Sequence, residues 1–459
     1  MKKYIFFVVG VMCTLLSHTA YAIDLNKSDA NIIGHVLEKK TGEHLPYMTV
    51  ALKGTTIGTM TDGTGHYFLK NLPEGEFILS VSAVGYKPQE RKVTLKRGKT
   101  LEENFELEED MVALDGVVVT ANRNETARRL APTLVKVVTP KLFDMTNSHT
   151  LSQGLVFQPG VRVENDCQNC GYSQVRINGM DGKYTQILID SRPIFSALAG
   201  VYGLEQIPAN MIERVEVVRG GGLVPFRSSA IAGTVNIITK EPLRNSGSFA
   251  HSISNFDGSG SFDNNTTLNL SLVSSDNKMG AYIYGQNRHR SAWDSNGDSF
   301  SELPKLKNQT VGVNAYYRLS PYSKLNLEYH HMEEFRRCGN RFDLPPHIAE
   351  DANLNGSGEP GLVEQIEHSI NTGGLKFSAF SKDQKHAFNA YASAQHIVRD
   401  SYYSAYGHTT DFTGVLGAQY IYHFDKLFFM PSDLTGGVEF NHDNLDDKAT
   451  DMQKDRDAA

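Results

Sequence analysis

The sequence predicts a mainly β protein with three parts: an N-terminal β-sandwich, a central α+β domain and an incomplete antiparallel transmembrane β-barrel of about nine strands. Three observations predict this fold class. Turn residues separate short strand-like runs between residues 32 and 109. Three Val- and Ile-rich runs bounded by Gly, Pro or Ser lie between residues 175 and 240. From residue 245, segments of about ten residues alternate in polarity, as strands do when one face contacts lipid.

The composition limits the class of protein further. A chain of 459 residues is long enough for two or more domains. The net charge of −7 argues against a nucleic-acid partner, which would require a basic face. No apolar run reaches the roughly 18 residues of a membrane-spanning helix. A membrane location would therefore require a barrel, because lipid cannot hydrogen-bond to exposed backbone groups.

Residues 1–22 have the pattern of a signal peptide. Lys2 and Lys3 precede an apolar segment at residues 4–16, and the small residues Ala20 and Ala22 frame a cleavage site. The alternative, a membrane anchor, is disfavoured because the apolar segment is too short to span a bilayer. Export would place the mature chain in a compartment that permits disulfides.

Residues 23–110 are predicted to form the β-sandwich. Short strand-like runs are separated by turns such as Thr61-Asp62-Gly63 and Pro73-Glu74-Gly75. The spacing of Gly34, Gly54, Gly65 and Tyr67 in these runs resembles the carboxypeptidase regulatory-like domain. No zinc-protease spacing of the HExxH type occurs here. The resemblance therefore implies a binding or spacer module, and a purely structural extension is the alternative.

Residues 111–126 form a linker that follows an acidic stretch at residues 102–110. Within this linker, residues 117–120 are three valines and a threonine, which favour an extended conformation. Such a segment can add a strand to the sheet edge of a partner protein, because backbone hydrogen bonds supply most of the affinity. It could equally be the first strand of the following domain.

Residues 127–242 contain the three apolar runs, at residues 186–190, 212–218 and 234–239. The sequences QILIDSRPI, IERVEVVRG and AIAGTVNIITK, in this order, resemble the plug domain of TonB-dependent outer-membrane transporters. The resemblance implies a plug inside a barrel, an outer-membrane location and an N-terminal domain in the periplasm. It also implies a TonB box that binds TonB of the inner-membrane energising complex, formed by Asp115, Gly116, Val117, Val118, Val119, Thr120 and Ala121.

Two plug arginines, Arg176 and Arg219, match positions where this family pairs the plug with barrel glutamates. A buried guanidinium requires such a partner, so these pairs would anchor the plug. The alternative is ordinary surface charge.

Cys167 and Cys170 have a CxxC spacing, which permits a disulfide, a metal site or a substrate contact. No second CxxC and no nearby histidine accompany them, so the expectation for an exported protein is a local disulfide. Cys338 is left as an odd thiol.

Residues 243–459 are assigned to the barrel. Short links on one side and long links on the other are typical of outer-membrane barrels. About nine strands are expected here, whereas plugged transporter barrels have about 22. The last residues are charged and lack a terminal aromatic side chain. The sequence is therefore expected to be a partial or truncated chain.

The candidate ligand residues lie in this last part. His330, His331 and Glu333 are expected on a long outer loop, where they would contact haem or a metal; the alternative is a solvated strand end. Asp351, Asn353 and Asn355 resemble the start of a calcium loop. Leu362 stands where that loop requires Glu, so the match is broken and no other cofactor is expected.

Several functions are compatible with these patterns. The leading hypothesis is TonB-dependent uptake of a scarce nutrient, an iron-siderophore or haem. Cobalamin or another metal complex is the alternative within transport. A third hypothesis is a non-transporting surface binding or signalling protein, or an inactive fragment. An enzyme is not expected, because no nucleophile–base constellation and no intact metal motif occurs.

Overall fold

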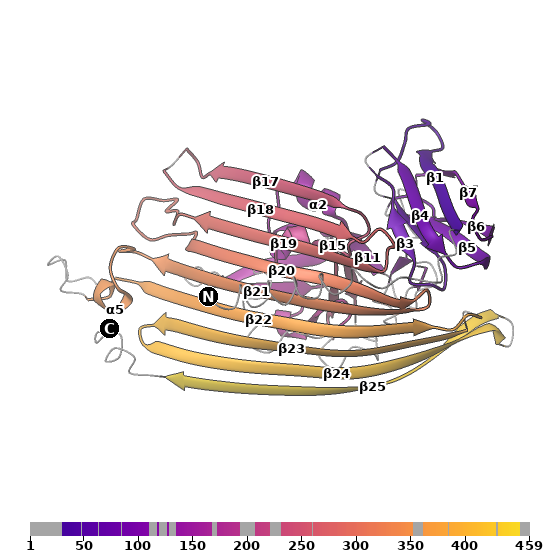
Figure 1. Cartoon of the computed structure of the whole chain (residues 1–459). Coiled ribbons are helices and arrows are strands. Elements are labelled where there is room, and N and C mark those ends of the chain that lie inside the picture. The colour runs from indigo at the N-terminus through magenta and orange to yellow at the C-terminus, as the bar shows by residue number, and fades with distance from the viewer. Residues whose placement is uncertain are drawn as a thin grey trace.

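The computed structural model describes residues 30–46, 48–62, 64–83, 85–109, 117–118, 126–127, 135–167, 172–192, 207–220, 231–258, 260–351, 361–383, 385–427 and 430–449. The chain is mainly β, as predicted. An N-terminal domain lies at one end of a long curved sheet, and a central domain lies against one face of that sheet (Figure 1). The predicted signal peptide falls outside the described residues.

The N-terminal domain is a β-sandwich, as the turn spacing predicts. One sheet contains β4, β1 and β7, with β8 also paired to β1, and the other has the order β3-β2-β5-β6. Alternate side chains of each strand are buried between the two sheets, including Ile32, Leu69 and Leu79. The strands are β1 (Ala30–Glu38), β2 (Thr49–Leu52), β3 (Gly58–Met60), β4 (His66–Leu72), β5 (Gly75–Ser82), β6 (Gln89–Leu95), β7 (Thr100–Glu102) and β8 (Phe105–Leu107).

Gly34 lets the backbone between β7 and β8 approach β1. A Cβ at this position would overlap the carbonyl oxygen of Glu103, which also accepts a 2.5 Å hydrogen bond from the Tyr67 hydroxyl. This explains why glycine stands at position 34 in a strand interior.

Replacing Gly34 by alanine should therefore destabilise the N-terminal domain by about 3 kcal/mol, because the added methyl group forces two backbone segments apart. Hydrogen exchange of the domain's strand amides in the intact chain would measure the loss. Gly98→Ala is the matched control: its Cβ meets open space, and its positive φ of 64° costs only about 1–2 kcal/mol. Equal protection in the two variants would contradict the steric argument.

The linker is described at only two places. Strand β9 (Val117–Val118) pairs antiparallel with β10 (Thr126–Ala127). The predicted strand-prone segment is therefore extended where it can be seen. Asp115, Gly116, Val119, Thr120 and Ala121 lie outside the described residues.

The central domain is built on a four-stranded sheet of order β11-β15-β16-β14. The three predicted apolar runs are the strands β14, β15 and β16, and their valines and isoleucines form its core. Two short helices, α2 and α3, lie between β11 and β12. The elements are β11 (Val135–Val138), α2 (Pro140–Met145), α3 (Leu151–Leu155), β12 (Val161–Cys167), β13 (Tyr172–Ile177), η3 (Gly182–Tyr184), β14 (Thr185–Ile189), η4 (Ala209–Met211), β15 (Ile212–Arg219) and β16 (Gly233–Thr239).

The last part of the chain is a nine-stranded antiparallel sheet with strands in sequence order, which confirms the predicted strand number. Within the described residues the sheet is open, because β17 and β25 do not pair with each other. Its strands are β17 (Ser246–Asn255), β18 (Phe262–Val273), β19 (Met279–Arg290), β20 (Lys305–Ser320), β21 (Ser323–Gly339), β22 (Val363–Phe380), β23 (His386–Tyr403), β24 (Tyr406–Leu427) and β25 (Met430–Ala449), with helix α5 (Pro346–Ala349) between β21 and β22.

One face of this sheet carries a band of exposed apolar side chains. Cross-strand partners such as Phe249 and Leu268, Leu327 and Leu375, and Leu416 and Phe440 all lie on it. The opposite face is turned to the central domain. Such an apolar band is the surface expected of strands whose outer face contacts lipid.

No helix among the described residues is long and apolar enough to cross a membrane.

The N-terminal domain contacts the short-turn end of the sheet (Figure 1). The Thr56 backbone N–H donates to the Pro321 carbonyl at 2.8 Å, and Arg318 Nε donates to the Thr56 carbonyl at 2.7 Å. Tyr322, in the same β20–β21 turn, packs against the core of the N-terminal domain. The connection at residues 291–304 and the described residues 340–351 lie at the other end of the sheet.

Candidate functional site: the interface between the central domain and the curved sheet

A tight turn after β14 positions the central side chain of the interface. Asp190 and Ser191 both have positive φ, of 46° and 66°, and Ile189 and Arg192 exchange backbone hydrogen bonds across them. This is the geometry of a two-residue hairpin turn, which disfavours most side chains. Asp190 offsets the strain by accepting hydrogen bonds from the backbone and side chain of Thr239, at 3.0 and 2.7 Å.

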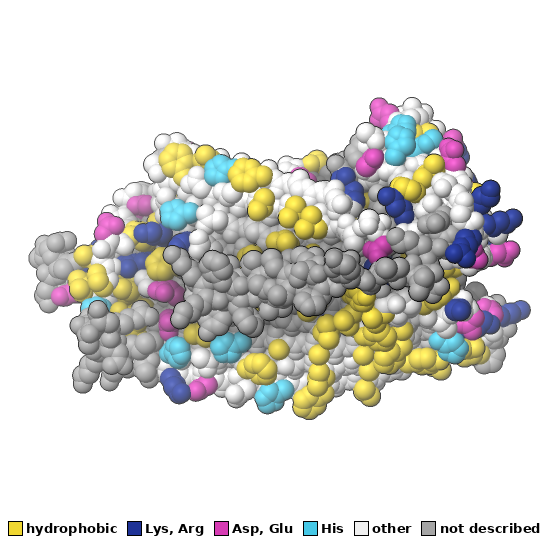
Figure 2. Space-filling model, viewed as in Figure 1, with side chains coloured by type: hydrophobic (Ala, Val, Ile, Leu, Met, Phe, Trp, Pro, Cys, Tyr) yellow, Lys and Arg dark blue, Asp and Glu magenta, His cyan; other side chains and the backbone are white. Residues whose placement is uncertain are grey.

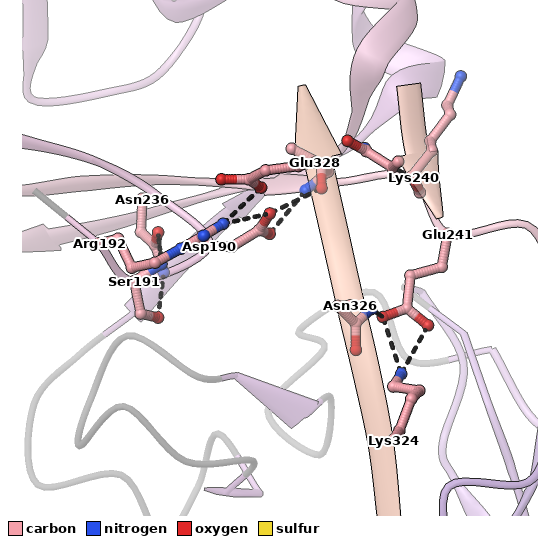
Figure 3. Close-up of polar contacts among 11 residues, drawn as sticks. Asp190, Ser191, Arg192, Asn236, Lys240, Glu241, Lys324, Asn326 and Glu328 are labelled. Atoms are coloured by element: carbon pink, nitrogen blue, oxygen red, sulfur yellow. Dashed lines mark hydrogen bonds and ion pairs between the residues drawn. The ribbon is translucent and has the colours of Figure 1, made fainter. Parts of the chain in front are cut away.

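Arg192 leaves this turn and crosses to the curved sheet. Its Nη2 atom lies 2.5 Å from Oε2 of Glu328 on β21 and 3.6 Å from Oδ2 of Asp190 (Figure 3). The side chains of Arg192 and Glu328 are only 5% and 14% exposed. Burial lowers the pKa of Arg192, but the carboxylates of Glu328 and Asp190 outweigh this effect and hold the pKa above its ordinary value. The guanidinium is therefore charged and depends on these carboxylates.

The ion pair is made by a single guanidinium nitrogen. Arg192 Nε and Glu328 Oε1 are both buried, and within the described residues neither has a hydrogen-bond partner. A bidentate pair would use both oxygens of the carboxylate. The contact therefore joins the two parts of the chain through one strong hydrogen bond. One nitrogen of the guanidinium and one oxygen of the carboxylate make no hydrogen bond within the described residues.

A second ion pair lies where the central domain leads into the sheet. Glu241 accepts hydrogen bonds from Lys324 Nζ at 3.0 and 3.1 Å and from Asn326 Nδ2 at 3.2 Å (Figure 3). Partial burial raises the pKa of Glu241, but the Lys324 ammonium outweighs this effect and holds the pKa below its ordinary value. Lys324 and Asn326 alternate with Glu328 along β21, so all three point to the central domain.

Hydrogen bonds between uncharged groups join the central domain to strands β18 and β19. The Tyr282 hydroxyl donates to the Asn210 carbonyl at 2.9 Å, and Asn210 Nδ2 donates to Asn269 Oδ1 at 2.9 Å. Tyr282 and Tyr284 of β19 also join the apolar core of the central domain. The interface therefore combines a shared apolar core with two ion pairs.

The predicted anchoring arginines have other surroundings. Arg176 forms ion pairs with Glu164, and with Asp181 at 3.3 Å, and both carboxylates belong to the central domain. Arg219 lies over Gly160, and no carboxylate of the described residues forms an ion pair with it. In the described part of the chain, Arg192 forms the arginine–glutamate pair between the central domain and the sheet, a role that the sequence analysis assigned to Arg176 and Arg219.

The predicted ligand residues require a correction. His330, His331 and Glu333 lie on strand β21 rather than on a loop. Successive strand residues point to opposite faces, so His330 shares the face of Glu328 while His331 and Glu333 lie on the other. His331 Nδ1 lies 2.9 Å from Asn371 Oδ1, and its Nε2 lies 3.5 Å from Glu333. The three residues therefore do not converge on one ligand.

Some predicted sites cannot be placed. Cys170, Asn353 and Asn355 lie outside the described residues, so the disulfide with Cys167 and the calcium loop beginning at Asp351 remain predictions. Cys338 is buried.

A group of acidic side chains lies on the connection between β19 and β20. Asp294, Asp298 and Glu302 have carboxylate oxygens within 4.8 Å of one another. These carboxylates accept hydrogen bonds from backbone amides of the same loop, for example Gly297 to Asp294 at 2.7 Å. They therefore shape the loop.

Arg192 and Glu328 are not among the site residues predicted from the sequence. A signal for Arg192 was present, because a charged residue directly after an apolar strand and a tight turn lies at the edge of the domain. Glu328 gave no such signal, because the inner face of a barrel strand is polar in any case. Only the register of β21 shows that the two residues meet.

Comparison with known protein families identifies two of the three parts. Residues 32–119 match the family described as CarboxypepD_reg-like domain, and residues 127–234 match the TonB-dependent Receptor Plug Domain. The chain therefore contains a CarboxypepD_reg-like domain followed by the plug domain of TonB-dependent receptors. From here on, the central domain is called the plug.

Individual relatives agree with this class. The chain is 31% identical over 229 residues to the vitamin B12 transporter BtuB of Vibrio vulnificus strain YJ016, covering 43% of this chain and 37% of the relative. It is 34% identical over 128 residues to BtuB of Photobacterium profundum, covering 27% of this chain and 20% of the relative. The chain thus spans well under half of the length of these curated relatives. They are transporters by name, consistent with the prediction that the chain is not an enzyme.

Solved structures share the fold. The siderophore receptor PirA of Acinetobacter baumannii superimposes with a TM-score of 0.58 at 18% identity, covering 69% of this chain and 49% of that chain. FpvA of P. aeruginosa superimposes with a TM-score of 0.57 at 14% identity, covering 73% of this chain and 46% of that chain. At these identities the likeness concerns the fold alone.

Proposed function

We propose that this protein is an outer-membrane receptor for the active uptake of a scarce nutrient, energised by TonB. The observation that carries the proposal is the plug held against the inner face of the strand sheet through the buried Arg192–Glu328 pair. A single-hydrogen-bond charge pair can be broken and remade when a partner pulls on the plug.

Residues 115–121 are proposed as the segment that TonB binds. The segment precedes the plug, and its described part, Val117 and Val118, is already extended. An extended segment pairs with a partner's sheet edge through backbone hydrogen bonds. The N-terminal domain would share the periplasm with TonB, because it contacts the short-turn end of the sheet.

The proposed cargo is a metal complex, with an iron-siderophore or haem as the first candidate. The solved relatives named as siderophore receptors support this choice. Cobalamin is the second candidate, because the curated relatives at 31–34% identity are named vitamin B12 transporters. Both cargoes are large chelates for which a plugged barrel is suited.

Uptake by cells that express or lack the protein would test the proposal. Under iron limitation, we expect the protein to increase accumulation of a labelled ferric siderophore or of haem, and only when TonB is present. Labelled cyanocobalamin in parallel assays separates the second candidate. Accumulation that does not depend on the protein for any of the three cargoes would refute the proposed function.

A further inference from the structure

Three histidines gather on the surface of the N-terminal domain. His35 lies in β1, His44 in the connection between β1 and β2, and His66 at the start of β4. Their ring centroids are 5.3 Å apart for His35 and His44, 5.7 Å for His35 and His66, and 4.9 Å for His44 and His66. Figure 2 shows histidine side chains gathered on this domain, on the side away from the strand sheet.

The backbone brings these side chains together. His35 and His66 are direct cross-strand partners in the β1–β4 pair. His44 is held beside them because Leu37 and His44 form a β-bridge. Gly65, with a φ of 77°, lies so close to His44 that a Cβ on it would be 2.8 Å from the His44 Cβ. The fold therefore holds the three histidine positions next to one another.

A hydrogen-bond chain fixes the tautomer of His66. The Thr64 hydroxyl donates to Asp62 Oδ1 at 2.7 Å, and Thr64 Oγ1 lies 3.1 Å from His66 Nδ1. Because the hydroxyl proton is directed to the carboxylate, Thr64 accepts from His66, whose Nδ1 then carries the proton. The Nε2 atom of His66 is left with a free lone pair, as in metal-bound histidines whose other nitrogen is held by an outer partner.

We propose that His35, His44 and His66 bind one divalent transition-metal ion of the Zn²⁺ class. Imidazole nitrogens suit Zn²⁺, Cu²⁺ and Ni²⁺. Zn–N bonds of about 2.1 Å at tetrahedral angles place imidazole centroids about 5 Å apart, close to the separations seen here. The rings are exposed or half-exposed, so side-chain rotation can turn their nitrogens to a common point. Three histidines leave the fourth position for water or another ligand.

Calorimetric titration of the full chain in detergent with Zn²⁺ tests this site. We expect one Zn²⁺ per chain and a loss of at least about 100-fold in affinity for His66→Gln, since a ligand is removed. Thr64→Val keeps all three ligands but removes the outer hydrogen bond, and should weaken binding about 10- to 100-fold. The control is His251→Gln, an exposed histidine that also contacts a threonine hydroxyl, Thr266, at 2.8 Å.

Two further readouts make the test decisive. Co²⁺ bound at the same site should give the intense visible absorbance of a tetrahedral ion, which the His35→Gln/His44→Gln/His66→Gln variant should lack. Lower pH should weaken Zn²⁺ binding, because only neutral imidazoles act as ligands. Zn²⁺ binding by the triple variant with unchanged stoichiometry and affinity would overturn the assignment, as would no binding by the unaltered chain. Circular dichroism of each variant verifies that the domain remains folded.

Discussion

Replacing Glu328 by leucine should weaken the attachment of the plug to the strand sheet by about 3–5 kcal/mol, because it leaves the Arg192 guanidinium buried without its partner. The Arg192 side chain is 5% exposed, so water cannot replace the lost carboxylate. Asp190, at 3.6 Å, is too distant to form a full hydrogen bond with Arg192 Nη2. Hydrogen exchange of plug amides in the intact chain would measure the loss as faster exchange in β14 and β16.

Strand β21 also offers a residue whose replacement should leave the plug attached. Glu333→Gln removes a charge from the same strand but from the opposite face, and should leave plug exchange unchanged. Arg192→Met combined with Glu328→Leu replaces the pair by apolar side chains of similar size and should recover most of the stability. If Glu328→Leu alone left plug exchange as it is in the unaltered protein, the pair would not hold the plug.

The rescue variant also separates stability from function. If the Arg192–Glu328 pair must break and re-form during transport, the Arg192→Met/Glu328→Leu variant should keep the plug in place but reduce uptake. An apolar contact has no directional hydrogen bond that would return the plug to its original position. A rescue variant that transports as well as the unaltered protein would show that any well-packed contact is sufficient. Measuring cargo uptake and hydrogen exchange on the same set of variants distinguishes these two outcomes.

The sequence predicted the plug strands well because their physical signal is local. The runs that became β15 and β16 are rich in valine and isoleucine and have a glycine close to one end, and most of their apolar side chains are buried in the plug core. Gly233 shows how local that signal is. It begins β16 with a φ of 155°, and a Cβ there would overlap the Val218 carbonyl, so the glycine that bounds the run is also required by packing.

Alternating polarity marks only part of strand β21. The alternation covers residues 324–332, whereas the strand begins at Ser323 and continues to Gly339. Beyond Tyr329 the outward face is mostly polar: His331, Glu333 and Arg337 lie on it, with Phe335 as its apolar residue. Alternation then disappears although the backbone pairing with β22 continues. Hydrophobic periodicity therefore reports the part of a strand that faces lipid and not its full length.

Most of the candidate site could not be predicted from the sequence, because it depends on register between distant segments. Arg192 and Glu328 are 136 residues apart in the chain. Glu328 meets Arg192 only because β21 pairs with β20 and β22 in the register seen here, and a shift by one residue would turn Glu328 to the outer face. No local pattern fixes that register, whereas the signal for a plug is contained in short runs.

Deleting residues 115–121 should reduce cargo uptake to the level of cells without the protein while leaving cargo binding at the cell surface unchanged. Val117 and Val118 already form strand β9, and pairing with β10 uses one of its two edges. A TonB strand could pair with the other edge or displace β10, and either mode depends on backbone groups that the deletion removes.

Single substitutions test that backbone dependence. Val118→Thr retains the backbone N–H and the β preference, and should transport normally. Proline at position 117 or 118 removes one N–H, and adjacent strand residues direct these groups to opposite edges. One of the two proline variants should therefore disturb the β10 pair and the other the edge proposed for TonB. Surface binding and uptake of the same labelled cargo, measured on the same cells, check this expectation; uptake that survives the deletion would show that the pull on the plug enters elsewhere in the chain.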